Sequence, residues 1–253
     1  MTSDENIYFN RRFNEWEKIF PTQEPNCHLF QGPRTSYEPA VFRYLSSQLG
    51  LETLIEDLFL EAPEEWTVEE MGSGRLHLSF VQFLARLVNV QSALEIGTFV
   101  GLSAIALAQT IPSSGRIVSI EKFEKFANIA RRNIARNNLS NKIEVIVGDA
   151  LKIFSDGSLG ESFDLIFVDG DKANYLEYVR KGLELLSPQG IIIVDDIFFQ
   201  GDVFNDEPSS HKGAGVKACL EWVSCQTHLD ITIVPIGNGV LLVRKRGFEH
   251  RPK

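Results

Sequence analysis

The spacing of hydrophobic and polar positions changes along the chain near residue 90. Before that point, apolar residues recur at helical spacing over residues 37–60 and 76–90, and no run is typical of a strand. After residue 92, short apolar runs alternate with helical patterns. The two hydrophobic patterns predict a helical N-terminal extension over residues 1–73 and an α/β domain over residues 74–253.

The apolar runs of the second region are short enough to be strands. They cover residues 92–99, 116–120, 143–147, 163–169, 190–196, 231–236 and 239–245. Strands that alternate with helices of this length pair in parallel and are covered on both faces. Only Gly237, Asn238 and Gly239 join the last two runs, as in a hairpin, so we expect one edge strand to be antiparallel. The fold class is therefore α/β, a doubly wound, mostly parallel seven-stranded sheet with an antiparallel C-terminal hairpin.

Composition narrows the class of protein. A chain of 253 residues, 43% hydrophobic and 23% charged, has the size and balance of one globular domain with an extension. Its net charge of -9 argues against a nucleic-acid backbone as the main partner, although a small RNA met by a local patch stays open. Cys27, Cys219 and Cys225 lack metal-binding spacing, which favours reduced thiols in the cytoplasm. The sequence predicts neither a membrane span nor a secretory signal.

A glycine-containing loop follows the first predicted strand. Gly97 and Gly101 there let the backbone approach a ligand closely, and ligands of open parallel sheets bind at the carboxyl ends of strands. A dinucleotide-binding loop would carry a further glycine, where this chain has Phe99. The loop therefore argues against an NAD-dependent oxidoreductase.

Acidic residues stand at the ends of the first three strands. Glu121 is placed to accept both hydroxyls of a ribose, and Asp149 to accept from an exocyclic adenine amine. Glu95 lies just before the glycine loop, where it is able to meet an ammonium group. A ligand with adenine, ribose and an amino-acid head but no phosphates would use all of these features. S-adenosylmethionine (SAM) fits that description.

Further acids end the fourth and fifth strands. Asp169 is followed by Lys172, and Asp195 is followed directly by Asp196. Neighbouring strands lie about 4.8 Å apart, so these carboxylates are able to converge, and without a cation they would repel each other. All-oxygen ligands favour Mg²⁺, with Mn²⁺ or Ca²⁺ as alternatives. Zinc is not indicated, because no cysteine or histidine accompanies these acids in the motif.

Two histidines and a cluster of arginines are interpreted as structural or surface residues and not as site residues. His77 and His211 are able to approach this site, but we expect each to be a satisfied or surface histidine. Arg131, Arg132 and Arg136 form a local basic cluster, which we interpret as the solvated face of a helix.

The motifs together resemble those of the class I, cation-dependent O-methyltransferases, the group of catechol and caffeoyl-coenzyme A O-methyltransferases and their bacterial relatives. The resemblance covers residues 74–246 and lies in LEIGTFVGLSAIALA, IVSIEKF, VGDA, FDLIFVDGDKANYLEYV, IIIVDDIFFQGDV and VPIGNGVLLVRKR. It implies that Lys172 is the catalytic base, that Asp169, Asp195 and Asp196 hold the metal, and that Phe199 lies beside the acceptor ring. It also implies a SAM site lined by Glu95, Gly97, Phe99, Gly101, Ser103, Glu121, Asp149, Ala150 and Asp169.

The chain departs from the family pattern in two places. Asp196 stands where the family usually has asparagine, and a third anionic ligand should bind a cation more tightly but acidify the substrate less. Residues 1–73 do not match the family, and we expect them to take part in acceptor choice. A homodimer follows only from the resemblance.

The predicted activity is methyl transfer from SAM to one hydroxyl of a vicinal dihydroxy aromatic small molecule. Two alternatives remain open: methylation of a hydroxylated wobble uridine in tRNA, and a non-catalytic SAM-binding protein. Residues 201–215 are polar and rich in turn formers, and they are interpreted either as a mobile lid with hinges at Gly213 and Gly215 or as a plain surface loop.

Overall fold

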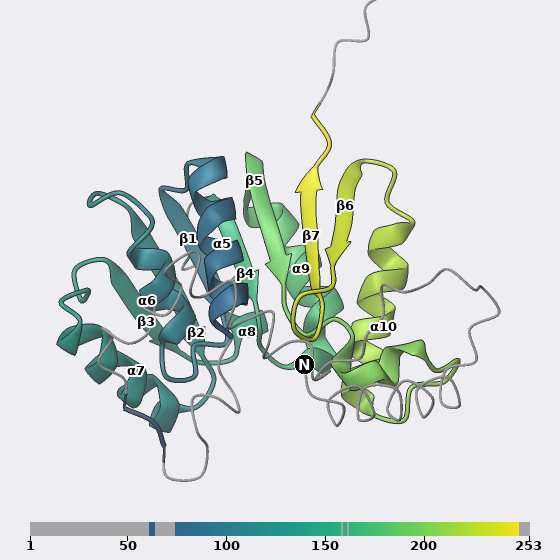
Figure 1. The fold of residues 1–253 in the computed structure, drawn as a ribbon, viewed down its shortest axis with the longest axis horizontal. Helices are drawn as coiled ribbons and strands as arrows, with labels where there is room; N and C mark the ends of the chain where they lie inside the picture. Colours follow the sequence, from purple (N-terminus) through teal and green to yellow (C-terminus); the bar gives the residue numbers. More distant parts are fainter. Residues whose placement is uncertain (1–60, 64–73, 158, 161, 248–253) are drawn as a thin grey trace, which may run out of the picture.

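The computed structural model describes residues 61–63, 74–157, 159–160 and 162–247. Within these ranges, seven strands form one sheet in the order β3-β2-β1-β4-β5-β7-β6, with helices on both faces (Figure 1). The strands are β1 (Ser92–Ile96), β2 (Arg116–Glu121), β3 (Ile143–Val147), β4 (Phe163–Val168), β5 (Leu186–Val194), β6 (Leu229–Val234) and β7 (Val240–Lys245). The helices are α5 (Arg75–Val88), α6 (Leu102–Ala108), α7 (Glu124–Arg136), α8 (Ala150–Ser155), α9 (Tyr175–Leu185) and α10 (His211–Ser224), with 3-10 turns η1 (Lys172–Asn174) and η2 (Phe199–Phe204). Apart from residues 61–63, the predicted helical extension over residues 1–73 lies outside the described residues.

The strand pairing confirms the doubly wound sheet. The pairs β3-β2, β2-β1, β1-β4 and β4-β5 are parallel, and β7 is antiparallel to both β5 and β6. The expected antiparallel edge strand is confirmed, because β6 forms the edge and pairs antiparallel with β7, which lies inside the sheet. The chain reaches the outer edge through α10 first, and the turn over residues 235–239 then returns β7 into the gap between β5 and β6.

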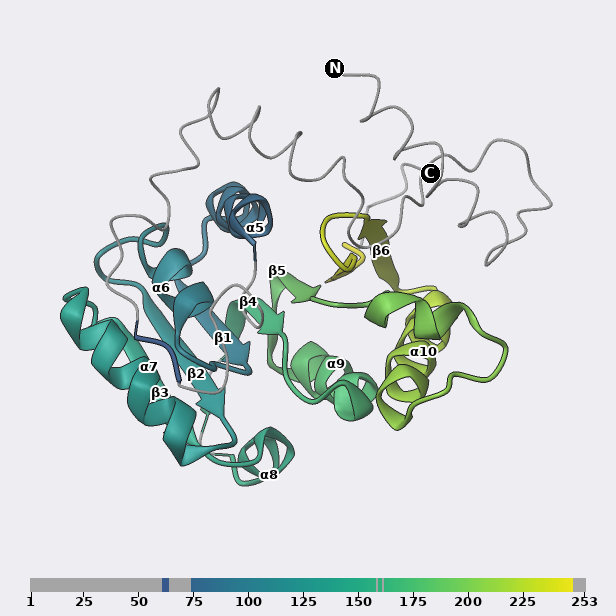
Figure 2. The same ribbon diagram turned by 60° about the horizontal axis from the view of Figure 1, so that its bottom comes forward.

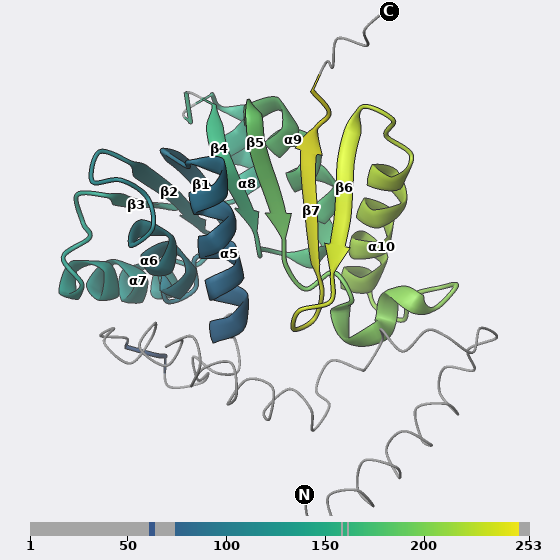
Figure 3. The same ribbon diagram turned by 45° about the horizontal axis from the view of Figure 1, so that its top comes forward.

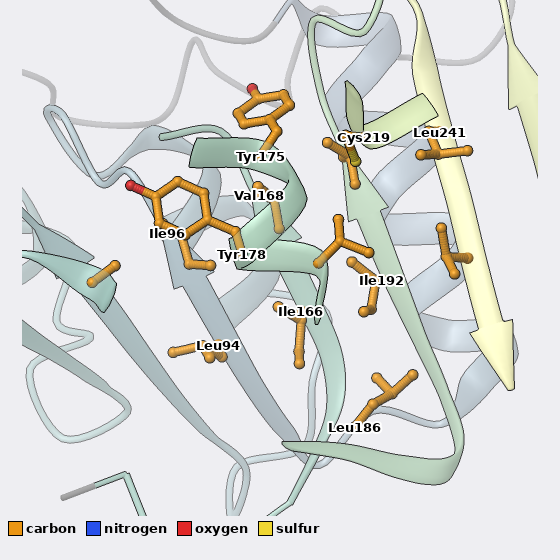
Figure 4. Close-up of a cluster of buried hydrophobic side chains, with 14 of the residues drawn as sticks. Leu94, Ile96, Ile166, Val168, Tyr175, Tyr178, Leu186, Ile192, Cys219 and Leu241 are labelled. Carbon is orange, nitrogen blue, oxygen red and sulfur yellow. The ribbon is translucent and has the colours of Figure 1, made fainter. Parts of the chain in front are cut away.

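Two hydrophobic clusters hold the helices on opposite faces of the sheet. One joins the sheet to α5, α6 and α7, and the other joins it to α8, α9 and α10 (Figures 2 and 3). Leu165 and Phe167 of β4 belong to the first cluster, whereas Ile166 and Val168 belong to the second. Figure 4 shows part of the second cluster, where Tyr178 of α9 lies beside Ile96 of β1. Because both faces are buried, the central strands are apolar on both sides.

The register of the parallel strands brings their carboxyl ends into one row. Val168 of β4 pairs with Ile96 of β1 on one side and with Val194 of β5 on the other. The backbone N–H of Asp169 donates to the carbonyl of Ile96 (2.9 Å), and that of Asp195 donates to the carbonyl of Val168 (2.9 Å). Asp169 and Asp195 are therefore side by side at the same edge of the sheet.

The segment over residues 201–215 is held by specific contacts. The carboxylate of Asp202 accepts from the backbone N–H groups of Ser209 (2.7 Å) and Ser210 (3.1 Å) and from both serine hydroxyls. Gly213 and Gly215 lie within α10, so their interpretation as hinges is wrong. A Cβ at Gly213 would lie 2.0 Å from Asp202 Oδ2, and one at Gly215 would lie 2.5 Å from the Cα of Ala173. Both glycines therefore serve close packing.

Two of the cysteines lie in the described residues, and both are free thiols. Burial raises the pKa of the Cys219 thiol to about 12, so this group is unreactive, whereas Cys225 is exposed. Cys27 lies outside the described residues. Across the same ranges, none of the helices has the length and apolar content that crossing a membrane requires.

Candidate active site

An acidic centre lies where β4 and β5 end. The ammonium of Lys172 is 2.8 Å from Asp169 Oδ1 and 3.1 Å from Asp196 Oδ2, so one cation bridges two carboxylates. The backbone N–H of Asp196 donates to Asp195 Oδ1 (2.7 Å). Asp196 has a φ of 56°, a left-handed conformation that aspartate and asparagine tolerate better than most residues. The four residues that the sequence predicted for metal and base therefore lie together.

Lys172 is positioned by two elements that pack on each other. Asp171 caps η1 by accepting from the backbone N–H of Ala173 (3.3 Å), which sets the turn that carries the lysine. α10 approaches the same turn so closely that a Cβ at Gly215 would lie 2.5 Å from the carbonyl oxygen of Lys172. The ammonium also lies 5.6 Å from the centre of the Tyr175 ring. The lysine is thus directed toward the acids by packing from a helix about forty residues further along the chain.

His77, which we expected to be a satisfied or surface histidine although able to approach the site, lies beside Asp195. Its Nδ1 lies 3.2 Å from Asp195 Oδ2, and only 5% of the residue is exposed. Burial lowers the pKa of this imidazole to about 4, so it is neutral at pH 7. The available signal was its place beside Leu78 in the first turn of an amphipathic helix, which marks a buried face but does not identify its partner. His211, by contrast, is exposed at the start of α10.

Burial and mutual repulsion set the charge states of the centre. Burial, reinforced by the charges of neighbouring aspartates, raises the pKa of Asp169 and raises that of Asp195 well above its ordinary value. Burial alone would lower the pKa of Lys172, but Asp169, Tyr175 and Asp196 raise it well above the ordinary value. When all three acids are ionised, the site holds three carboxylates and one ammonium, which leaves an excess of negative charge in a mostly buried site.

The donor set of this centre fits a hard divalent cation. In the part of the chain that the structure describes, no three side chains among histidine, cysteine, aspartate and glutamate are already gathered as ligands around one point. Asp169 and Asp196 face the ammonium of Lys172, and Asp195 faces His77. Carboxylate oxygens and an excess of negative charge are what a hard cation such as Mg²⁺ prefers. Asp169, Asp195 and Asp196 are the residues that would hold it.

The glycine loop lies directly against this centre. Gly97 has a φ of 98°, and a Cβ there would lie 2.3 Å from the carbonyl oxygen of Asp169. Gly101 has a φ of 87° and precedes the first residue of α6. Phe99 has a φ of 48°, and its ring meets that of Phe126 edge to face at 5.3 Å. Both glycines therefore occupy conformations that L-residues rarely adopt, and Gly97 also permits the contact between β1 and β4.

Glu95 lies at the centre of a buried polar chain. Its carboxylate is fully buried and accepts hydrogen bonds from the hydroxyls of Ser103 (2.5 Å) and Ser119. The Ser119 and Thr98 hydroxyls are 2.5 Å apart. Burial raises the pKa of Glu95 to about 7. The residue therefore orders the hydroxyl groups beneath the glycine loop.

Glu95→Gln is expected to flatten the dependence of stability on pH. Because the pKa of Glu95 in the folded protein lies above its ordinary 4.5, the folded state takes up a proton between these values. The resulting stabilisation is full below pH 4.5 and is lost as the pH rises through 7, by about 3 kcal/mol at most. Urea unfolding of both proteins from pH 5 to pH 8 measures this difference. Glu144→Gln, at an exposed position of β3, is the control, and equal pH slopes for wild type and Glu95→Gln would contradict the assignment.

Glu121 and Asp149 lie at the same edge, after β2 and β3. Glu121 accepts from the backbone N–H groups of Phe99 (2.9 Å) and Phe123 (2.9 Å), and burial raises its pKa. Asp149 caps α8 by accepting from the N–H of Leu151 (3.0 Å), with Ala150 buried as the first residue of that helix. The strands thus deliver Glu95, Glu121 and Asp149 to one edge beside the acidic centre, in the predicted order.

Phe199 lies in a strained loop after β5. Its φ is 40°, that of Gln200 is 55°, and its side chain is partly buried against the cluster under α9 and α10. The hairpin turn holds this loop, because the carbonyl of Asn238 accepts from the N–H of Phe198 (2.8 Å) and its side chain accepts from that of Gln200 (3.1 Å). Backbone strain of this kind persists only where the surroundings enforce it, and it often marks functional loops.

The basic cluster on α7 is engaged within the protein. Arg132 and Arg136 both pair with Glu61, at 2.5 Å and 3.3 Å, and Arg131 donates to the carbonyl of Val145 (2.8 Å). A cavity of about 540 Å³ lies beside Arg131 at the amino ends of β2 and β3, so it does not contain the acidic centre. These contacts do not favour an RNA-binding surface.

Comparison with known proteins identifies the family. The O-methyltransferase family matches residues 45–246, so the statement that residues 1–73 do not match the family is wrong for residues 45–73. A catechol O-methyltransferase of Niastella koreensis is 30% identical over 204 residues, which cover 77% of this chain and 89% of the relative. A caffeoyl-CoA O-methyltransferase of Stellaria longipes is 28% identical over 194 residues, which cover 73% of this chain and 80% of the relative.

Solved structures share the fold. An O-methyltransferase of Streptomyces achromogenes involved in tomaymycin synthesis, in complex with SAM, has a TM-score of 0.74 and 28% identity; the match covers 85% of this chain and all of that one. An O-methyltransferase of Bacillus cereus in complex with S-adenosylhomocysteine (SAH) has a TM-score of 0.70 and 30% identity; the match covers 81% of this chain and 97% of that one.

Proposed function

This chain belongs to the O-methyltransferase family, and we propose that it transfers the methyl group of SAM to one hydroxyl of a catechol-like small molecule with the help of a divalent cation. The observation that carries the proposal is the contact between the glycine loop and the acidic centre at Gly97 and Asp169. A methyl donor on the loop and a hydroxyl at the acids would then be neighbours. Mg²⁺ is the favoured cation, with Mn²⁺ or Ca²⁺ as alternatives.

The residues around the loop suit the parts of SAM. Glu121 would accept from the ribose hydroxyls, and Asp149 with Ala150 would border the adenine. Ser103 and Glu95 would receive the amino-acid end, with the Glu95 carboxylate holding the serine in place. The SAM-bound and SAH-bound relatives named above support this choice of methyl donor.

The chemistry needs a deprotonated oxygen in line with the methyl carbon. A phenol has a pKa near 10 and is mostly protonated at neutral pH. A divalent cation held by Asp169, Asp195 and Asp196 would lower the pKa of a hydroxyl bound to it. The oxygen then attacks the methyl carbon, the electron pair of the broken C–S bond stays on sulfur, and SAH leaves. Lys172 Nζ would accept the hydroxyl proton.

Lys172 can act as a base only if the negative charge of the neighbouring acids is offset. Its pKa is raised by Asp169, Tyr175 and Asp196, so with the acids uncompensated it is an ammonium and cannot accept a proton. Burial works in the opposite direction and would dominate once the negative charge of the acids is offset. The lysine is therefore proposed to act as base only in the charge-compensated site. Asp196, in place of the family's asparagine, adds one more charge to compensate.

Removal of the cation is the direct test of this function. Protein treated with chelator is expected to lose at least about 100-fold of its methyl transfer from labelled SAM to catechols, hydroxycinnamoyl thioesters or flavonoids, because a bound cation contributes several kcal/mol. Added Mg²⁺ should restore the rate. Asp169→Asn and Asp195→Asn should lose turnover, while Glu221→Gln, on the exposed face of α10, serves as the control. If chelator leaves the activity unchanged, the cation requirement is refuted. If the protein methylates tRNA and not catechols, the proposed catechol-like acceptor is wrong and tRNA takes its place.

A further inference from the structure

We propose that Asn238, in the turn between β6 and β7, is a positioning residue of the acidic centre: it holds the loop over residues 196–200 in the conformation that places Asp196 and Phe199 beside the acceptor. The inference rests on the proposed function, because it concerns the part of the same site that would receive the acceptor. It adds to that site a residue about forty positions further along the chain.

The pairing of β5 with β7 brings the turn to this loop. Val194 of β5 lies opposite Leu241 of β7, and the two strands are antiparallel. The chain that follows Val194 therefore runs beside the chain that precedes Leu241. Asp196 lies in the first of these stretches and Asn238 in the second. The turn is thus a direct neighbour of the residues that end the acidic motif.

The loop has a backbone conformation that needs support. Asp196, Phe199 and Gln200 have φ values of 56°, 40° and 55°. This left-handed region is uncommon for residues other than glycine, and for a bulky residue such as Phe199 it marks strain. Strain of this kind persists only where the surrounding structure enforces it. The surroundings of the loop therefore decide where its side chains lie.

Hydrogen bonds from the loop to the turn supply this support. Ile197 N–H donates to the carbonyl of Gly239 (3.1 Å), and Phe198 N–H donates to the carbonyl of Asn238 (2.8 Å). Gln200 N–H donates to the side-chain Oδ1 of Asn238 (3.1 Å). Asn238 thus holds the loop with its backbone and its side chain together, and the side-chain contact can be removed without altering the backbone of the turn.

Close packing at Gly239 fixes the same loop. Gly239 is buried, its φ is 86°, and a Cβ there would lie 2.6 Å from Cδ2 of the Phe198 ring. Gly237, in the same turn, has a φ of 56°, but an added Cβ would meet nothing within 4 Å. The turn therefore contains one glycine that contacts the loop and one that does not.

The glycine loop has different supports. Gly97 packs against the carbonyl of Asp169, and Phe99 N–H donates to Glu121 (2.9 Å). These contacts lie after β1, β2 and β4, whereas the turn meets the chain after β5. A change in the turn should therefore affect the acceptor side of the acidic centre and leave the binding of SAM unchanged.

Two substitutions of Asn238 test the side-chain contact. Asn238→Ala removes the acceptor for Gln200 N–H, whereas Asn238→Asp keeps it. In Asn238→Ala the Gln200 amide hydrogen should exchange faster with solvent. The KM for a catechol and the Kd for Mn²⁺ should each rise about 5-fold, as expected for one hydrogen bond, while the Kd for SAM stays within about 2-fold. Asn238→Asp should restore the slow exchange and the wild-type constants.

The two glycines of the turn provide a matched pair. Gly239→Ala is expected to raise the KM for a catechol at least about 10-fold, because its Cβ would displace the Phe198 ring and the loop with it. Gly237→Ala has the cost of a left-handed alanine but no contact with the loop, so its KM should stay at the wild-type value. Equal KM values in the two proteins would contradict a role for the turn in positioning the loop.

The outcomes separate this inference from the proposed function. If the wild type methylates no catechol and binds no Mn²⁺, the proposed function is refuted, and the exchange of the Gln200 amide still decides whether Asn238 holds the loop. Unchanged exchange in Asn238→Ala would overturn the inference. So would faster exchange with wild-type values of both constants. Equal losses of SAM and catechol binding would also overturn it, because they would indicate a general loosening of the protein.

Discussion

Lys172→Met is expected to lower kcat by at least about 100-fold while SAM affinity changes little. Methionine keeps an unbranched side chain of similar length but cannot accept the hydroxyl proton. It also removes the ammonium that lies 2.8 Å from Asp169 and 3.1 Å from Asp196, so Mn²⁺ affinity should stay equal or increase. Steady-state kinetics, together with calorimetry for SAM and Mn²⁺, would separate these effects.

A second substitution distinguishes a base from a counter-ion. Lys172→Arg retains the positive charge, but a guanidinium does not lose its proton in proteins. If Lys172 serves as base, the arginine protein should be as inactive as the methionine protein. Substantial turnover in Lys172→Arg would assign the lysine a purely electrostatic role, and wild-type turnover in Lys172→Met would remove it from the mechanism. Lys212→Met, exposed in the first turn of α10, is the control.

Gly97→Ala is expected to destabilise the protein by at least about 2 kcal/mol and to weaken SAM binding. At a φ of 98° the alanine is strained, and its Cβ would lie 2.3 Å from the carbonyl oxygen of Asp169. Neither partner is a flexible side chain, so the backbone of the loop or of Asp169 has to move. Urea unfolding and SAM titration measure the two effects.

Gly157 offers a matched control for this prediction. Its φ is 72°, but an added Cβ would meet nothing within 4 Å. Gly157→Ala should therefore show only the cost of the left-handed conformation, about 1–2 kcal/mol, without a change in SAM affinity. If Gly97→Ala lowered stability and SAM affinity no more than Gly157→Ala, the backbone contact with Asp169 would accommodate the added Cβ. The glycine loop would then not be coupled to the acidic centre through this contact.

The positions of the acids were predictable because they follow from local pattern and one general rule. Runs that are apolar on both sides identify buried parallel strands, and the carboxyl ends of such strands share an edge. Asp169 and Asp195 therefore had to be neighbours once their strands were paired, as the hydrogen bond from Asp195 N–H to the Val168 carbonyl illustrates. Glu95, Glu121 and Asp149 followed from the same rule.

The errors came from contacts between distant segments. Gly213 and Gly215 suggest flexibility in a polar stretch, but in the folded chain they allow α10 to approach Asp202 and Ala173. The Gly-Asn-Gly turn predicted a hairpin correctly but did not reveal that Asn238 holds the loop around Phe199. Glycine has the same local signature whether it provides freedom or close approach, so the sequence pattern cannot separate the two.

The strands, the helices, the parallel core of the sheet and the edge at which the acids gather follow from residue order alone, because they depend on periodicity within short segments. Long-range packing, in contrast, places β7 between β5 and β6, brings His77 of α5 to Asp195, and puts Lys172 between two carboxylates that raise its pKa. Each of these depends on which surfaces pack together across the whole chain. The charge states and hydrogen bonds within a site follow from that packing, so they cannot be predicted from the order of residues alone.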